Sequence, residues 1–199
     1  MITYRKIIIV GVVLIILLVS FSLQRRKVIG NPDVINEITR IEKLGAPDEN
    51  GSSNIIPQDL NRLKELVKED KIAESYVNEL DWLVRNGEGQ HILHTTLYMR
   101  EYIKTGEDVP CIPHELWHVS LFVKHGDIDY AKKRLKSIEK NYDVWVKSVE
   151  EKRKAYPQFY NGSEELEQMS RESIEKLKQN NYSNKTLEQL DIIGAAALC

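Results

Sequence analysis

Residues 122–149 read FVKHGDIDYAKKRLKSIEKNYDVWVKSV, and this stretch decides the fold class. Gly126 and Asp127 mark the end of one helix and the start of the next, and Pro157 ends the pattern that follows. Apolar side chains in the second helix recur at alternating steps of four and three, which puts them on one face: Ala131, Leu135, Ile138, Tyr142, Trp145 and Val149. The pattern predicts a long helix, from about Asp127 to Tyr156, with one continuous apolar seam.

The helix end before that seam has two close counterparts upstream. Residues 83–88 (LVRNGE), 102–107 (YIKTGE) and 122–127 (FVKHGD) each combine apolar residues, a base, a glycine and an acid. Glycine suits the left-handed residue that closes a helix, and the charges suit a helix C-terminus followed by a new N-terminus. The glycines are 19 and 20 residues apart. We therefore expect helices of similar length, joined by short turns and packed antiparallel.

Further helices are predicted on both sides of this region. Asn31-Pro32-Asp33 is typical of a helix start, and we expect that helix to stop at Gly45. Other helical patterns cover residues 57–67, 72–86 and 163–178, and no segment alternates convincingly as a strand. The sequence therefore predicts an all-α fold, with antiparallel helical hairpins or a bundle after one N-terminal transmembrane helix.

These sequence patterns predict that the chain has four parts. Residues 1–27 form a membrane anchor or signal peptide, and residues 28–57 form a short helix and a linker rich in turn-forming residues. Residues 58–180 form the helical domain. Residues 181–199 are a tail to which the sequence assigns no structure.

Composition excludes several classes of protein. The 199 residues are 42% hydrophobic and 29% charged, so a packed core is expected and wholesale disorder is excluded. The net charge of −2 shows no basic excess, and we expect no nucleic-acid partner. Two cysteines, Cys111 and Cys199, are too few for a disulfide framework or a four-cysteine zinc site.

The anchor is predicted from residues 7–23 (IIIVGVVLIILLVSFSL), a run without charge between basic clusters. As a helix it would be about 26 Å long, at the short end for spanning a bilayer. Ser20-Phe21-Ser22 is a weak cleavage site, so a signal peptide is the alternative. We expect an uncleaved, single-pass anchor, because Arg25, Arg26 and Lys27 follow that site directly.

Two rules disagree about the orientation of the anchor. The basic residues after the span outnumber Arg5 and Lys6 before it, which by the positive-inside rule would keep the body in the cytoplasm. The short basic N-terminus before a single apolar run resembles signal anchors, which places the body outside. We favour an extracytoplasmic body.

One local resemblance concerns the centre of the helical domain. Residues 124–127 (KHGD), followed by Ala131, Leu135 and Ile138, resemble the middle of a tetratricopeptide repeat. The small and aromatic positions of the repeat's first helix fall on Val119 and Phe122. The resemblance covers about residues 115–138 and implies helical hairpins.

A second resemblance concerns the histidines. Residues 114–118 (HELWH) match the HExxH motif of zinc metallopeptidases. The match implies that His114 and His118, one turn apart on a helix, bind zinc, and that Glu115 takes a proton from the metal-bound water. Pro113 directly before the motif indicates that the motif opens its helix. The sequence identifies no third ligand.

Two other interpretations compete with a catalytic zinc site. Glu115 is favourable in the first turn of any helix, and His114 and His118 could be structural side chains packed against a neighbouring element. Alternatively, the histidines form a non-catalytic metal or haem site. His91 and His94 share one stripe of the preceding helix, and an antiparallel pairing would put them level with His125, with Cys111 as an added ligand.

We therefore keep three functional hypotheses in order. The leading one is a membrane-anchored interaction or scaffold module that binds a protein partner and needs no cofactor. The second is a zinc-dependent metallopeptidase or hydrolase that uses the HExxH motif. The third is a non-catalytic metal or haem protein that uses its histidines as ligands.

Overall fold

The computed structural model describes residues 28–46, 53–108, 111–160 and 162–196. Within these ranges the chain forms eight packed α-helices, two short 3₁₀ turns and no strand, which confirms the all-α prediction. None of the described helices is long and apolar enough to cross a bilayer. The anchor predicted at residues 7–23 lies outside the described residues.

The chain separates into two compact units, residues 1–108 and residues 109–199, and each is described by itself. This division falls inside residues 58–180, where the sequence suggests a single helical domain. The predicted tail, residues 181–199, contributes a helix to the second unit.

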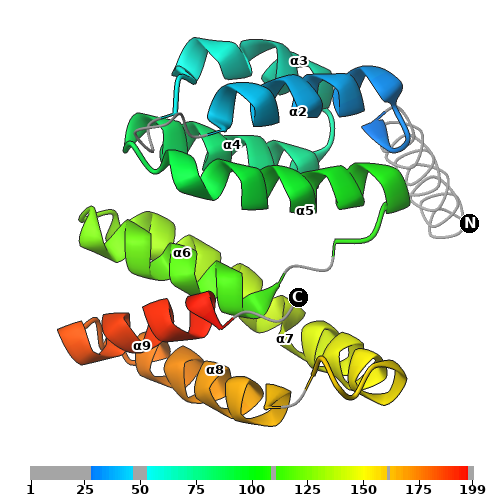
Figure 1. The fold of residues 1–199 in the computed structure, drawn as a ribbon. Coiled ribbons are helices and arrows are strands. Elements are labelled where there is room, and N and C mark those ends of the chain that lie inside the picture. The colour runs from blue at the N-terminus through cyan, green and yellow to red at the C-terminus, as the bar shows by residue number, and fades with distance from the viewer. Residues whose placement is uncertain (1–27, 47–52, 109–110, 161, 197–199) are drawn as a thin grey trace, which may run out of the picture. The chain divides into compact units, whose positions relative to one another are not determined.

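The first unit contains four α-helices (Figure 1). These and the two short turns are α2 (Pro32–Gly45), η1 (Pro57–Leu60), α3 (Asn61–Val67), α4 (Lys71–Arg85), η2 (Gly89–His91) and α5 (Ile92–Thr105). α5 packs against both α2 and α4, and the core consists of apolar side chains from all four helices, most of them aliphatic. Arg100 of α5 bonds Thr39 and Glu42 of α2, which runs antiparallel to it.

Local signals explain where these helices begin and end. Asn31 caps α2 by accepting from the Asp33 amide, as the sequence predicts. Gly45 is the last residue of α2, which confirms the predicted helix end, although its backbone is not left-handed. A side chain at position 45 would come within 2.7 Å of Ile92, so glycine there permits the close approach of α2 and α5.

The second unit consists of α6 (Ile112–Lys124), α7 (Ile128–Ala155), α8 (Ser163–Lys178) and α9 (Asn184–Ala195). α6 packs against both α7 and α9, and α8 contacts α7 and α9 (Figure 1). The predicted seam of α7 is confirmed, because these residues are the buried ones in that helix: Ala131, Leu135, Ile138, Tyr142, Trp145 and Val149. α6 and α7 pack against each other as a hairpin.

The three predicted glycine turns are confirmed. Gly87, Gly106 and Gly126 all have positive φ, between 76° and 81°, directly after α4, α5 and α6. At Gly126 an added Cβ would meet no atom within 4 Å. The requirement for glycine there is therefore conformational, and it fixes the turn between α6 and α7.

Candidate functional site

The HExxH motif lies in the first turns of α6. Cys111 is the N-cap residue, and Pro113 occupies the first turn, as predicted. A proline is tolerated there because the first amides of a helix have no intrahelical acceptor. His114, Glu115 and His118 are all buried, with 3% or less of each residue exposed.

His114 and His118 are neighbours along α6 because they are one helical turn apart, and their rings meet edge to face. Their ring centroids are 4.2 Å apart and the ring planes meet at 61°. His114 also lies edge-on to Trp117, and His118 lies edge-on to Phe122. The two imidazoles belong to one aromatic row in the second unit, so the structure brings the two predicted zinc ligands together.

Glu115 makes a contact that the sequence analysis missed. Its Oε2 lies 3.0 Å from Nη1 of Arg134 on α7, and the two side chains are 4% and 11% exposed. An ion pair of this burial is strongly favoured by charge once both groups have left water. The pair links α6 to α7 one helical turn beyond Tyr130, which packs edge-on against Phe122.

The position of Arg134 explains why it was missed. It immediately precedes Leu135 of the apolar seam, and its neighbours Lys132 and Lys133 are ordinary exposed bases. Which of three consecutive basic residues meets an acid on another helix depends on the rotation of α7 against α6. One sequence signal was available, namely that position 134 lies one turn after Ala131 and so borders the buried face.

α9 holds the other side of α6. Ser120 donates to Oδ1 of Asp191 at 2.8 Å, and Lys124 donates to Oδ2 of the same carboxylate. Gly194 packs directly on the side chain of Trp117, where a Cβ would come within 2.5 Å. These contacts explain why α6 is apolar on nearly every side, since neighbouring helices cover it.

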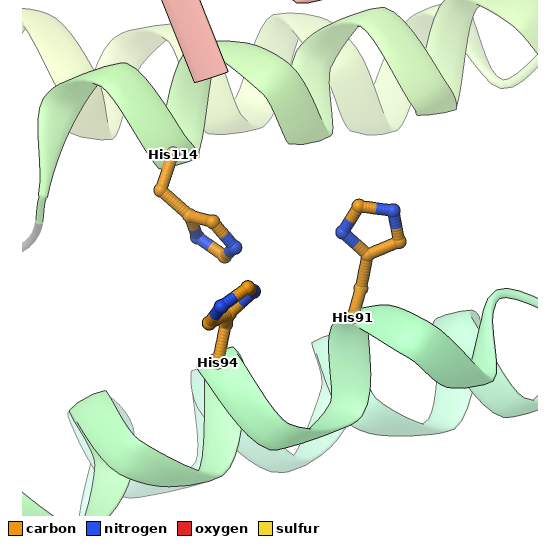
Figure 2. A group of neighbouring side chains, drawn as sticks. All are labelled: His91, His94 and His114. Carbon is orange, nitrogen blue, oxygen red and sulfur yellow. The ribbon is translucent and has the colours of Figure 1, made fainter. Parts of the chain in front are cut away.

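The first unit carries a separate pair of histidines. His91 ends η2 and is buried, whereas His94 on α5 is exposed. Figure 2 shows both side chains leaving the same side of their helix, and one ring nitrogen of each lies within 4.8 Å of the other. Nε2 of His91 is 3.9 Å from a carboxylate oxygen of Glu88.

The remaining predicted residues are distributed as follows. His114, the third histidine drawn in Figure 2, belongs to α6 of the second unit. His125 is the exposed C-cap residue of α6 and so also belongs to the second unit. Cys111 is disulfide-bonded, which rules out the prediction that its thiol serves as a metal ligand in this state.

A buried polar cluster in the first unit was also missed. Asp70 caps α4 by accepting from the amides of Ile72 and Ala73, and the Tyr102 hydroxyl donates to its carboxylate at 2.8 Å. With these donors the buried carboxylate is well satisfied, and the cluster connects the start of α4 to the end of α5. Its role is therefore structural.

A shallow groove of about 360 Å³ lies between α7 and α8 of the second unit. Both acids and bases line it, and Lys178 pairs with Glu175 at 3.0 Å and with Glu139 at 3.6 Å. The hydrogen bond with Glu175 raises the pKa of Lys178. The charged side chains that line the groove are three acids and two bases: Glu139, Asp143, Glu175, Arg171 and Lys178.

Comparison with protein-family models, with curated proteins and with solved structures finds no match for this chain.

Proposed function

We propose that this protein is a membrane-anchored, all-helical interaction module that binds a partner protein. The observation that carries the proposal is an exposed apolar pair on α5, Leu93 and Leu97, which are 49% and 46% exposed. They stand one helical turn apart, so their side chains adjoin on the helix surface. Adjacent exposed apolar side chains offer a surface that an apolar partner can cover, and this is the basis of the proposal.

The contacts of Glu115 support a non-enzymatic role. A metallopeptidase base must be able to reach the metal-bound water and accept its proton. Here the carboxylate is engaged by the guanidinium of Arg134, which stabilises its charged form and competes for its oxygens. The positive charge of a buried arginine beside the base also disfavours the binding of a zinc ion nearby.

The test of the interaction proposal compares leucine variants in the full chain. Photo-reactive residues placed at Leu93 and Leu97 should cross-link one discrete partner in intact membranes. The matched control is Glu101 on the same helix, which is also exposed to solvent but carries a charge. Equal cross-linking from all three positions, or none from the leucines, would contradict the proposal.

The second candidate function is a zinc-dependent hydrolase, and the 4.2 Å spacing of the His114 and His118 rings favours it. Metal analysis of the purified full chain should then find about one zinc per chain, lost in His118→Ala. Glu115→Gln should retain that zinc and lose hydrolysis of peptide substrates, since the glutamate is a base and not a ligand. On the interaction proposal, His118→Ala changes stability and leaves zinc content unaltered.

A non-catalytic metal site is supported by the pair His91 and His94 in the first unit. Two imidazoles on adjacent turns can hold one divalent ion between them. Titration with Zn²⁺ should separate the candidates, because His91→Ala and His94→Ala would each abolish binding while His118→Ala would not. His125→Ala tests whether the group predicted from the sequence includes that residue.

A further inference from the structure

α7 carries a row of lysines on the face that points to solvent. Positions 133 to 154 of this helix, taken at steps of three and four residues, lie along one side of it. That side is opposite the buried seam, and every side chain on it is exposed. Its positions, which we call the lysine stripe, are Lys133, Lys136, Lys140, Val144, Lys147, Glu151 and Lys154. At the rise of an α-helix the stripe is about 32 Å long.

The bases of α7 are separated by the direction in which they point. Both arginines of the helix pair with acids on neighbouring helices, Arg134 with Glu115 of α6 and Arg153 with Glu164 of α8. Four lysines of the stripe, by contrast, form no ion pair with another described residue: Lys136, Lys140, Lys147 and Lys154. Alternating signs of charge are typical of a helix face that meets only water, whereas this face carries five lysines and one glutamate. The stripe therefore presents a net positive charge to solvent.

The chemistry of lysine indicates what kind of anion this face suits. An ammonium group is a hydrated point charge without the planar fork by which arginine holds one carboxylate or phosphate in a fixed geometry. The lysines also stand on successive turns of a helix and do not converge on one point. The arrangement therefore fits an extended surface of negative charge better than a single bound anion.

Exposed apolar side chains accompany the stripe. Val144 lies within it and is 50% exposed, and the turn that follows Lys154 carries Tyr156 and Phe159, which are 56% and 67% exposed. Lysines beside aliphatic and aromatic side chains are typical of segments that lie in the interface of a bilayer. There the apolar groups enter the headgroup boundary, and the ammonium groups meet the lipid phosphates. This combination favours a bilayer over a soluble polyanion.

We propose that the lysine stripe, together with Tyr156 and Phe159, docks the second unit on the surface of a bilayer that contains anionic lipids. Docking in this way rests on the membrane anchor of the proposed function, because the anchor holds the body close to a bilayer. A tethered body needs only a weak contact, since its effective concentration at the surface is high. The stripe faces away from the core, so docking requires no rearrangement of the helices.

The first experiment places a photo-reactive residue at Val144 in the full chain. The chain is reconstituted into vesicles of phosphatidylcholine, and into vesicles of equal parts phosphatidylcholine and phosphatidylglycerol. We expect cross-linking to lipid to be about tenfold stronger in the anionic vesicles, because several lysines gain from the negative surface potential. The difference should disappear in 1 M NaCl, where the Debye length is about 3 Å. Equal cross-linking in the two kinds of vesicle would overturn the proposal.

The second experiment removes charge from the stripe in the same chain. The triple variant Lys136→Gln, Lys140→Gln and Lys147→Gln should lower cross-linking in anionic vesicles to the level found in phosphatidylcholine. The matched control makes the same change of net charge at exposed lysines of α2, α4 and α9, with unchanged cross-linking expected: Lys43→Gln, Lys71→Gln and Lys185→Gln. Circular dichroism checks that both variants remain helical. An equal loss in the two variants would show an effect of net charge and would overturn the proposed stripe.

Flotation of the same vesicles separates docking from anchoring. A chain that floats with both kinds of vesicle but gives no lipid cross-link from Val144 would overturn docking and leave the anchor intact. A chain that fails to float with phosphatidylcholine would contradict the anchor, while a salt-sensitive cross-link in anionic vesicles would still support the stripe. In native membranes, a cross-link from Val144 to a protein in place of lipid would overturn docking in favour of an acidic protein partner.

Discussion

Glu115 and Arg134 are 19 residues apart in the sequence and meet between α6 and α7. From the sequence alone, a structural Glu115 interacts only with the helix dipole, and its replacement should cost a few tenths of a kcal/mol. The buried ion pair changes that expectation, because removing one partner leaves the other charge buried without compensation.

We predict that Glu115→Ala destabilises the second unit by about 3 kcal/mol, and that Arg134→Met has a similar effect. The double variant should cost clearly less than the sum, because it leaves no isolated charge. Thermal unfolding of the full chain in detergent micelles, combined in a double-mutant cycle, measures the coupling. Strict additivity would mean that the two side chains do not stabilise each other.

Asp81 on α4 provides a pH-dependent contribution in the first unit. Burial by itself raises the pKa of the Asp81 carboxyl, but hydrogen bonds and charge from Arg85 and Lys64 outweigh it, so the net pKa is lowered. The pKa of an aspartate in the unfolded chain is about 3.9. Because the pKa of Asp81 is lower in the folded chain, its charged form stabilises the folded chain at pH values above about 3.9. This stabilisation is lost as the pH falls through the pKa of the folded chain.

We therefore predict that Asp81→Asn destabilises the first unit at pH 7 and that the difference from the parent chain shrinks as the pH falls below about 4. The measurement is the melting temperature of both proteins between pH 7 and pH 2. Glu65→Gln, at an exposed ion pair with Lys68 on α3, serves as the control and should have little effect at any pH. A difference that grows towards acid pH would have the wrong sign for this explanation.

At the scale of the elements, the turn between α6 and α7 depends on the left-handed backbone of Gly126. Gly126→Val should cost about 1–2 kcal/mol, since a β-branched residue is strained at positive φ. Gly126→Asn is the matched control, because asparagine tolerates this conformation, and it should cost less. Equal stability of the two variants in thermal unfolding would contradict the assigned turn.

The contact between α6 and α9 gives a second prediction at this scale. Gly194→Ala should loosen α9, because the new Cβ would come within 2.5 Å of Trp117. Relative to the parent chain, amide hydrogen exchange in Gly194→Ala should speed up more in α9 than in α8. Ala195→Gly should not show this difference. Trp117→Ala combined with Gly194→Ala should not restore the protection fully, because the nearest clashing atom is the Cβ of Trp117, which alanine keeps.

At the scale of the whole molecule, the anchor prediction concerns residues 7–23. The full chain should sediment with membranes and resist alkaline extraction, because its apolar run is buried in lipid. Deletion of residues 1–27 should release the body into the supernatant with an unchanged helical circular dichroism spectrum. Recovery of a soluble natural product beginning near Leu23 would instead identify a cleaved signal peptide.

The sequence by itself determined the helices other than α9, which lies in the tail to which it assigns no structure. The seam of α7, the cap at Asn31 and the glycines at 87, 106 and 126 are local signals, and each depends on residues within one or two turns of one another. Such signals lie next to one another in the chain, so they can be recognised before any packing is known. The HExxH spacing belongs to this class, and the juxtaposition of His114 and His118 follows from helix geometry alone.

Only the tertiary structure decided which side chains on different helices contact one another. The pairing of Glu115 with Arg134 and of Asp70 with Tyr102 depends on how one helix is rotated against another, which no short sequence pattern encodes. α2 ends at Gly45 as predicted, but only the packing shows that a Cβ there would come within 2.7 Å of Ile92 on α5. Side chains far apart in the sequence acquire their roles from packing. Burial removes water, so the interaction energy of a polar side chain then depends mainly on the charges and rings packed beside it.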